Sequence, residues 1–293
     1  MLYTLPVELN YNSAAGLRAF LDGNGLGMRK KFGQNFLINP GVRQGLADAL
    51  KAEAGESVWE IGPGLGAMTR ILLEKGLLVR AFEIDPGFIR VLKELFATEP
   101  GLTLVEGDVL KTWGGQREAH PAPYLLGNLP YNIGSALLAD FIEKGSFFRR
   151  MVVTVQREVA LRMAAKVGGA DYSSFSVLCA SAYRVKPLML IKSASFYPRP
   201  NVDSQGVLLE LREGPSRSPC FYPLVRQLFS SRRKTIRNNL TAFLARRGKA
   251  SPADLVAVLL EKSALDGGLR AENLHIDDFS ALAKAAEDMR LLP

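Results

Sequence analysis

The sequence predicts a doubly wound, mostly parallel α/β sheet followed by a small all-helical domain. Apolar, strand-like runs alternate with helical patterns between residues 58 and 155, and such alternation is typical of a parallel sheet with helices on both faces. Only helical patterns follow residue 219. The segment that precedes these helical patterns is rich in Gly, Pro and Ser, which indicates a linker. Its residues are Glu213-Gly214-Pro215-Ser216-Arg217-Ser218-Pro219.

The individual elements follow from hydrophobic periodicity. One helix carries Phe88, Val91, Leu92, Leu95 and Phe96 at the spacing of an amphipathic stripe. Residues 185–193 and 205–211 are joined by a short Pro-rich connection, which predicts an antiparallel pair at the sheet edge. The other predicted strands span residues 58–61, 77–84, 102–105, 124–126 and 151–155. The predicted helices lie at residues 67–75, 88–96, 135–144, 236–244, 254–262 and 277–289.

The 293 residues suffice for one large and one smaller domain. We expect a lead at residues 1–28, the sheet domain at 29–213 and the helical domain at 214–293. No apolar run is long enough for a membrane span and the N-terminus lacks a signal-peptide pattern, so we expect a cytoplasmic protein.

Charge and residue usage restrict the chemistry. The net charge of +8 favours a polyanionic partner. The two cysteines, Cys179 and Cys220, are far apart, which argues against a disulfide framework or a zinc site. With only two histidines as well, the expected reaction needs neither a metal nor an imidazole.

A glycine-rich loop, Glu60-Ile61-Gly62-Pro63-Gly64-Leu65-Gly66-Ala67, stands between a predicted strand and a predicted helix. Glycines there let the backbone turn tightly and approach a ligand at a helix N-terminus, as in Rossmann-like folds. The loop also satisfies the dinucleotide pattern G-x-G-x-x-G/A, with Glu83 where a ribose-binding acid is expected. Pro63 removes one backbone donor, which favours a nucleoside without a pyrophosphate.

Two acidic side chains follow the next two predicted strands. Glu83 ends the second strand, where a carboxylate can accept both hydroxyl hydrogens of a ribose. Asp108 ends the third strand and can accept the exocyclic amine of an adenine. Together with the glycine loop, these acids fit one nucleoside lying across the switch region of the sheet.

The tetrapeptide Asn128-Leu129-Pro130-Tyr131 ends the fourth predicted strand. An adenine N6 amine is a poor nucleophile, because its lone pair is delocalised into the ring. Acceptors for its hydrogens draw the nitrogen toward sp³ geometry. The Asn128 side-chain oxygen and the carbonyl of Leu129 or Pro130 can be these acceptors, and Tyr131 can stack on the base. No strong general base is required.

Seven collinear segments resemble the ribosomal RNA adenine dimethyltransferase family, from about Arg29 to Leu282. The segments are Phe32-Gly33-Gln34-Asn35-Phe36-Leu37, Glu60-Ile61-Gly62-Pro63-Gly64, Gly127-Asn128-Leu129-Pro130-Tyr131-Asn132-Ile133, Gln156-Arg157-Glu158-Val159, Phe196-Tyr197-Pro198-Arg199-Pro200-Asn201-Val202-Asp203-Ser204, Arg232-Arg233-Lys234-Thr235-Ile236-Arg237-Asn238-Asn239-Leu240 and Arg270-Ala271-Glu272-Asn273-Leu274. The resemblance implies a methyltransferase sheet domain with S-adenosylmethionine as donor. It also implies two adjacent adenines near the 3′ end of small-subunit rRNA as substrate, and hence a role in ribosome biogenesis.

The resemblance adds residues to the site. In the family, the F-G-Q-N-F-L segment closes over the cofactor, and Phe196 would hold the target adenine opposite Tyr131. The candidate cofactor-binding residues are Gln34, Asn35, Leu37, Gly62, Gly64, Glu83, Ile84, Asp108 and Asn128. The candidate catalytic residues are Asn128, Leu129, Pro130, Tyr131 and Phe196.

A basic segment with no acid runs from Phe229 to Ala250 in the predicted helical domain. Arg233 and Arg237 are spaced by one helical turn and are expected to share a face opposite the apolar stripe. We interpret the segment as a phosphate-contacting surface of a monomer that binds rRNA or a pre-ribosomal small subunit. The candidate RNA-binding residues are Arg232, Arg233, Lys234, Arg237, Arg246 and Arg247.

Other functions share parts of this pattern. A large-subunit rRNA methyltransferase or a DNA adenine methyltransferase would need the same cofactor and amine chemistry. The G-Q-N-F-L and R-R-K-T-I-R-N-N-L segments favour the small-subunit enzyme. An RNA-binding assembly factor with secondary catalysis is a further alternative. A nicotinamide oxidoreductase would be expected to offer a proton donor near the fourth strand, which Asn-Leu-Pro-Tyr does not obviously provide.

Overall fold

The computed structural model describes residues 9–28, 33–215 and 218–292. Phe32 of the first family segment and Ser216 and Arg217 of the expected linker lie outside these ranges. The chain divides into two compact units. Unit 1 consists of Met1–Leu138, Phe148–Ala160 and Lys186–Glu210, and unit 2 of Ala139–Phe147, Leu161–Val185 and Leu211–Pro293. The expected domain boundary after residue 213 stays a prediction.

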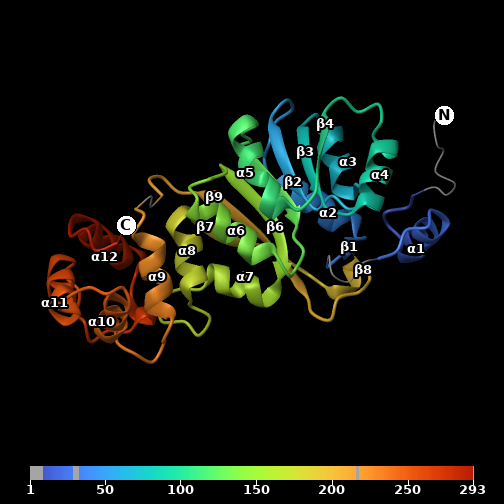
Figure 1. Ribbon diagram of the computed structural model, residues 1–293. Coiled ribbons are helices and arrows are strands. Elements are labelled where there is room, and N and C mark those ends of the chain that lie inside the picture. Colours follow the sequence, from blue (N-terminus) through green and yellow to red (C-terminus); the bar gives the residue numbers. More distant parts are fainter. Residues whose placement is uncertain (1–8, 29–32, 216–217, 293) are drawn as a thin grey trace. The chain divides into compact units, whose positions relative to one another are not determined.

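A seven-stranded sheet forms the centre of the fold (Figure 1). Strand β2 pairs in parallel with β3 and β5, the outer pairs β3–β4 and β5–β6 are also parallel, and β9 is antiparallel to β6. The predicted fold class is therefore confirmed, with the two late strands at one edge. The strands in spatial order are β4 (Leu102–Glu106), β3 (Leu78–Glu83), β2 (Ser57–Ile61), β5 (Tyr124–Asn128), β6 (Arg150–Gln156), β9 (Ser204–Leu211) and β7 (Tyr183–Ile191).

Two acids that closely follow strands cap the next helices. Asp85 accepts a hydrogen bond from Gly87 N at 2.8 Å, and Asp108 accepts one from Leu110 N at 3.0 Å, so each acid satisfies a free N–H at a helix start. The helices between residues 40 and 182 are α2 (Pro40–Ala49), α3 (Ala67–Glu74), α4 (Pro86–Leu95), α5 (Val109–Ala119), α6 (Gly134–Glu143), α7 (Arg157–Ala164) and α8 (Ser174–Ala182), and the short turn η2 (Ser193–Ser195) follows them.

Helices α2 and α3 bury their apolar faces against one side of the sheet. Leu46 of α2, Leu50 directly after this helix and Leu72 of α3 lie in one cluster with the strand residues Val58 and Val152. Burial of such side chains stabilises the unit by roughly 1.5–3 kcal/mol each. This cluster fixes the strand ends that carry the candidate site.

The N-terminal lead contains a helix that the sequence analysis did not predict, α1 (Ala14–Gly23). The Ser13 side chain caps it by accepting a hydrogen bond from Gly16 N. Its residues Leu17 and Phe20 are buried in a cluster with Leu65 and Phe88 of the sheet domain. Nearby, β1 (Phe36–Leu37) and β8 (Phe196–Tyr197) form a two-stranded antiparallel sheet.

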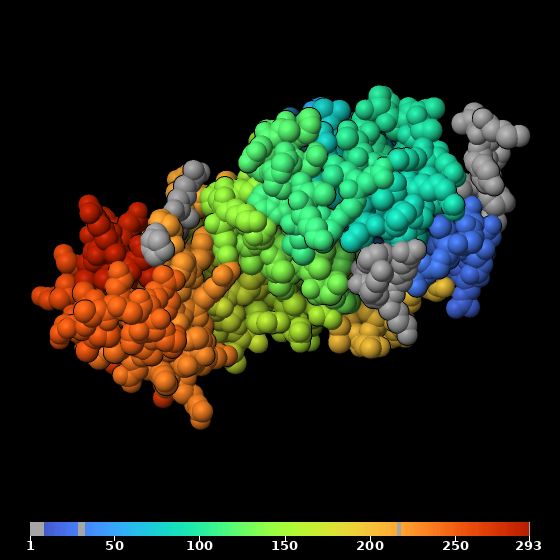
Figure 2. Space-filling view, in the orientation of Figure 1, coloured from blue at the N-terminus to red at the C-terminus, as the bar shows by residue number. Residues whose placement is uncertain are grey.

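The helices after residue 218 pack against one another. Their residues form the orange to red surface in Figure 2. The three predicted helices are present, but the preceding α9 was not predicted. Among the described residues, no helix is long and apolar enough to cross a membrane. The elements are α9 (Phe221–Phe229), α10 (Ile236–Arg246), α11 (Pro252–Lys262), the turn η3 (Ala271–Asn273) and α12 (Ile276–Asp288).

Candidate functional site

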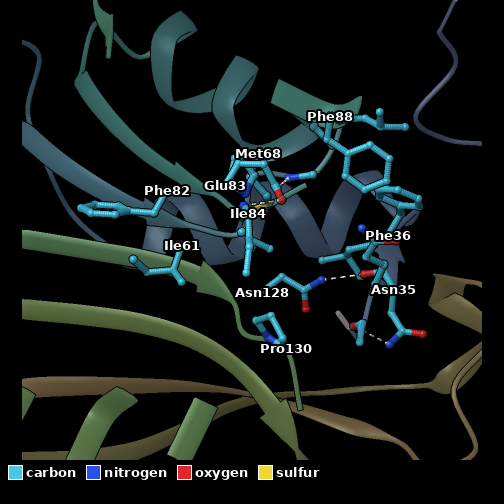
Figure 3. A pocket seen from close by; sticks show the side chains of 18 of the residues that line it. Asn35, Phe36, Ile61, Met68, Phe82, Glu83, Ile84, Phe88, Asn128 and Pro130 are labelled. Carbon is cyan, nitrogen blue, oxygen red and sulfur yellow. Dashed lines mark hydrogen bonds between the residues drawn. The ribbon is translucent and has the colours of Figure 1, made fainter. Parts of the chain in front are cut away.

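A cavity with about 110 Å³ of interior space opens at the carboxyl ends of the parallel strands, within unit 1 (Figure 3). The glycine loop and the residues that follow β3, β4 and β5 line it, together with the β1 segment. All predicted cofactor-binding residues lie in its wall, although they come from five separate places in the sequence. They are Gln34, Asn35, Leu37, Gly62, Gly64, Glu83, Ile84, Asp108 and Asn128.

The glycine loop depends on left-handed backbone conformations. Gly62, Gly64 and Gly66 have φ values of +69°, +59° and +89°, which L side chains rarely adopt. Their N–H groups donate to the carbonyl of Phe82 at 3.0 Å, to Glu83 Oε2 at 3.0 Å and to the Pro63 carbonyl at 2.9 Å. Since these donors are already satisfied within the protein, the loop is a poor cradle for a pyrophosphate.

Glu83 is a buried carboxylate with only 6% of its surface exposed. Its Oε1 accepts from Ile84 N and Asp85 N at 2.9 Å each, and its Oε2 accepts from Gly64 N. Burial raises the pKa of Glu83 to about 7, against the opposing effect of these backbone bonds. A carboxylate oxygen has two lone pairs, so Oε2 keeps one for a ligand hydroxyl.

Asp108 and Ile84 offer two different surfaces to the cavity. Oδ1 of Asp108 caps α5, while Oδ2 has no hydrogen-bond partner among the residues that the structure describes. Ile84 is 39% exposed and lines the cavity, so it offers an apolar surface there. An open carboxylate oxygen and an apolar face suit the amine edge and the ring face of a base.

The orientation of the Asn128 amide is fixed by a main-chain contact. Its Nδ2 donates to the carbonyl oxygen of Asn35 at 2.7 Å, drawn as a dashed line in Figure 3. Only the NH₂ end of an amide can donate to a carbonyl, so the contact identifies which end of Asn128 is the oxygen. Oδ1 has no partner in the described part of the chain and is free to accept a hydrogen from a ligand.

The structure distinguishes the two carbonyls that the sequence left open. The Pro130 carbonyl accepts from Ile133 N at 3.1 Å and from Gly134 N at 3.0 Å, where α6 begins. The Leu129 carbonyl has no such partner within the described ranges. Of the two, the Leu129 carbonyl is therefore the one without a partner. Leu129 itself is buried and does not line the cavity, whereas Pro130 does.

The two predicted stacking aromatics do not line the cavity. The Tyr131 hydroxyl lies 2.6 Å from Ser204 Oγ, and burial raises the pKa of Tyr131. Phe196 is only 3% exposed and packs in the core cluster with Leu37. The stacking role of both rings stays a prediction.

The sequence analysis did not assign every residue of the cavity wall to the site, and those it missed include Tyr11, Leu17, Phe36 and Arg43. For Leu17 a signal existed, because Leu17, Phe20 and Leu21 have helical spacing after Ser13. Phe36 is part of a family segment, yet it was not assigned a role. Nothing in the local sequence distinguishes Arg43 from a surface arginine.

The basic segment does not form one continuous helical face. Thr235 caps α10 by accepting from Asn238 N, so the helix begins at Ile236 and Arg233 lies in the preceding turn. The expectation that Arg233 and Arg237 share a helical face is therefore wrong. Ile236 itself is buried, as predicted for the apolar stripe.

The predicted RNA-binding cations differ in their surroundings. Arg233 and Lys234 are exposed, and their side chains have no hydrogen-bond or ion-pair partner among the described residues. Arg232, by contrast, donates to the Tyr172 carbonyl at 3.0 Å and lies 3.5 Å from Glu272.

The remaining three cations each contact a neutral neighbour. Arg237 lies against Gly267, Arg246 donates to Gln227 Oε1 at 2.8 Å, and the Arg247 guanidinium lies 4.8 Å from the Phe243 ring centre.

Comparison with known proteins shows which family the chain resembles. The profile of a family described as ribosomal RNA adenine dimethylase matches residues 25–275. A protein of Treponema denticola named ribosomal RNA small subunit methyltransferase A is 45% identical over 280 residues, covering 94% of each chain.

Solved structures show the same fold. A dimethyladenosine transferase from Plasmodium falciparum has a TM-score of 0.73 and 27% identity, and the match covers 85% of this chain and 96% of that one. The 23S rRNA methyltransferase ErmE has a TM-score of 0.61 at 22% identity, over 86% of this chain and 99% of that one, which shows the fold alone. With a family profile that spans most of its length, the chain belongs to the ribosomal RNA adenine dimethylase family.

Proposed function

We propose that the protein transfers methyl groups from S-adenosylmethionine to N6 of two adjacent adenines near the 3′ end of small-subunit rRNA. The product is N6,N6-dimethyladenosine, formed during ribosome biogenesis. The observation that carries the proposal is the pair of acceptors at the end of β5, Asn128 Oδ1 and the Leu129 carbonyl. Two neighbouring acceptors match the two N–H groups of one exocyclic amine.

The cavity residues fit the cofactor. Glu83 Oε2 would accept a ribose hydroxyl, Asp108 Oδ2 would accept the adenine amine, and Ile84 would contact the ring face. When bound, the cofactor supplies an electrophilic methyl group carried by a sulfonium. The buried walls keep bulk water from the amine and strengthen the hydrogen bonds that orient it.

The proposed chemistry relies on orientation and on hydrogen-bond acceptors. By accepting hydrogen bonds, Asn128 and Leu129 pull the two N–H hydrogens out of the plane of the base. The nitrogen lone pair then points at the methyl group and can attack it. The methylated, cationic amine then loses its proton readily, and no basic side chain is needed at this point. Tyr131 and Phe196 would hold the base between their rings; Tyr131 now contacts Ser204, and Phe196 packs in the core beside Leu37.

We expect the purified protein to bind S-adenosylmethionine and not NAD. The glycine-loop donors are used internally, and Glu83 and Asp108 suit a single nucleoside. Isothermal titration calorimetry with each ligand tests this. Binding of NAD at micromolar affinity with no binding of S-adenosylmethionine would overturn the assignment.

The exposed basic residues of unit 2 would contact the phosphates of the RNA. Arg233 and Lys234 carry charges that no acid in the described part of the chain neutralises, and Arg237 is exposed beside them in sequence. A flexible, exposed cation binds a phosphate by releasing condensed counterions, which makes the affinity depend on salt.

Neutral replacement of Arg233, Lys234 and Arg237 should weaken RNA binding while leaving cofactor affinity unchanged. The slope of log K against log salt should become shallower by about 0.7–0.9 per phosphate contact removed. Fluorescence anisotropy on the intact rRNA substrate at several salt concentrations measures the slope. The control variant is Lys262→Gln with Lys284→Gln, two exposed cations on α11 and α12. An equal change in the control would mean that net charge, rather than this segment, binds the RNA.

A further inference from the structure

Arg43 of α2 is a buried cation whose partners are all neutral. Only 5% of its surface is exposed. Its Nη1 donates to the carbonyls of Leu37 at 2.7 Å and Tyr11 at 3.2 Å, and its Nη2 donates to Asn12 Oδ1. A guanidinium has five N–H donors, so two remain, including the buried Nε–H, which has no hydrogen-bond partner. No carboxylate of the described residues lies against this charge.

The same side chain is part of the cavity wall. Among the described residues that line the cavity, Arg43 is the single cation, and it faces a lining that contains two acids, Glu83 and Asp108. Both acids have been assigned to the nucleoside part of the ligand. A buried charge without a counter-charge destabilises the folded protein, because water cannot solvate the charge there. The arrangement therefore favours an anionic group inside the cavity.

The N-terminal lead encloses Arg43 and keeps it from water. Tyr11 donates its hydroxyl hydrogen to the Leu65 carbonyl in the glycine loop at 2.9 Å, and Tyr11 and Leu17 line the cavity themselves. Burial lowers the pKa of the Arg43 guanidinium, but an arginine stays protonated at neutral pH. In such surroundings a charge attracts an opposite charge more strongly than it does in water.

We propose that Arg43 is the counter-charge for the carboxylate at the amino-acid end of the cofactor. The chain then distinguishes a complete S-adenosyl amino acid from its decarboxylated form, a distinction that Glu83 and Asp108 cannot make. The inference rests on the proposed function, because it assumes that the cavity binds S-adenosylmethionine. It assigns to Arg43 and the enclosing lead a role in ligand selection.

The test compares two ligands that differ in this carboxylate alone. These are S-adenosylhomocysteine and its decarboxylated counterpart, S-adenosyl-3-thiopropylamine, each titrated calorimetrically into the full-length protein. The wild type should prefer S-adenosylhomocysteine by about tenfold or more. Arg43→Met should lose that preference by weakening S-adenosylhomocysteine alone, and Arg43→Lys, which keeps the charge, should restore part of it.

Arg90→Met is the matched control. Arg90 of α4 also holds the lead, through a bond from its Nη2 to the Asn24 carbonyl at 3.3 Å, but it does not line the cavity. This variant should keep the wild-type preference, and melting temperatures of the ligand-free proteins report any structural loss.

Three outcomes would overturn the inference. The wild type binds both ligands equally; or Arg43→Met weakens both ligands to the same extent, as a purely structural clamp would; or it weakens neither. A wild type that binds neither adenosyl ligand would instead contradict the proposed function itself.

Discussion

Replacement of Asn128 by alanine should lower the turnover number by on the order of 10²–10³, the usual effect of removing one preorganised polar group. The physical reason is that Oδ1, held in place through the Nδ2 contact with the Asn35 carbonyl, is one of two acceptors for the target amine. Without it the amine stays planar and its lone pair remains in the ring. Cofactor affinity should change only a few-fold.

Single-turnover methyl transfer and calorimetry on the same preparations measure the two quantities. Thr154→Val is the matched control, since Thr154 is the neighbour of Asn128 in the β5–β6 ladder and its buried hydroxyl has no partner among the described residues. The isosteric change should leave turnover near the wild-type value. If Asn128→Ala reduces turnover and cofactor affinity equally, Asn128 is a cofactor-binding or folding residue and the amine mechanism is wrong.

Glu83→Gln should weaken cofactor binding by about 10- to 100-fold at high pH, because a hydrogen bond to a charged group contributes about 1.5–3 kcal/mol. The wild-type affinity should itself depend on pH. Only the ionised carboxylate accepts the ribose hydroxyl with full strength, and the pKa of Glu83 is about 7. Affinity should therefore rise as the pH increases through this value, and the variant should show no such rise.

The free energy of unfolding should fall over the pH range in which the cofactor affinity rises. The folded pKa of Glu83 is raised above its ordinary value of 4.5, so the native protein binds more protons than the unfolded chain between these values. The contribution of Glu83 to the free energy of unfolding then falls as the pH increases across this window.

Glu60→Gln serves as the control for Glu83. Burial also raises the pKa of Glu60 to about 7, but its Oε2 accepts from Thr69 Oγ1 at 2.6 Å and it does not line the cavity. In this variant the pH dependence of the free energy of unfolding should shrink by an amount comparable to that in Glu83→Gln. The rise in cofactor affinity with pH should be kept. Loss of the rise in Glu60→Gln, with the rise kept in Glu83→Gln, would reverse the two assignments.

The elements that could be predicted best from the sequence are those with a regular apolar pattern and clear end signals. An apolar run bounded by glycines and acids, such as the one ending at Glu83, predicts both the strand and where it ends. The site could then be predicted, because the carboxyl ends of parallel strands lie at the same edge of the sheet. Helix α5 was missed because Gly114 and Gly115 interrupt its periodicity. Helix α1 was missed even though Leu17 and Phe20 have helical spacing, because the lead carries no motif.

Side-chain conformations could not be predicted in the same way. That Tyr131 contacts Ser204 and that Phe196 packs beside Leu37 depends on which neighbours the fold provides. The position of Arg43 in the cavity wall is equally a tertiary property, set by its bonds to Leu37 and the lead.

Mass-spectrometric mapping of methylated adenines in rRNA, from cells with and without the gene, tests the central claim most directly. The account predicts two adjacent N6,N6-dimethyladenosines near the 3′ end of small-subunit rRNA in the parent cells and none in the deletion. The wild-type gene should restore them and the Asn128→Ala gene should not. Unchanged modification of the small-subunit RNA after deletion, or loss confined to large-subunit RNA, would contradict it.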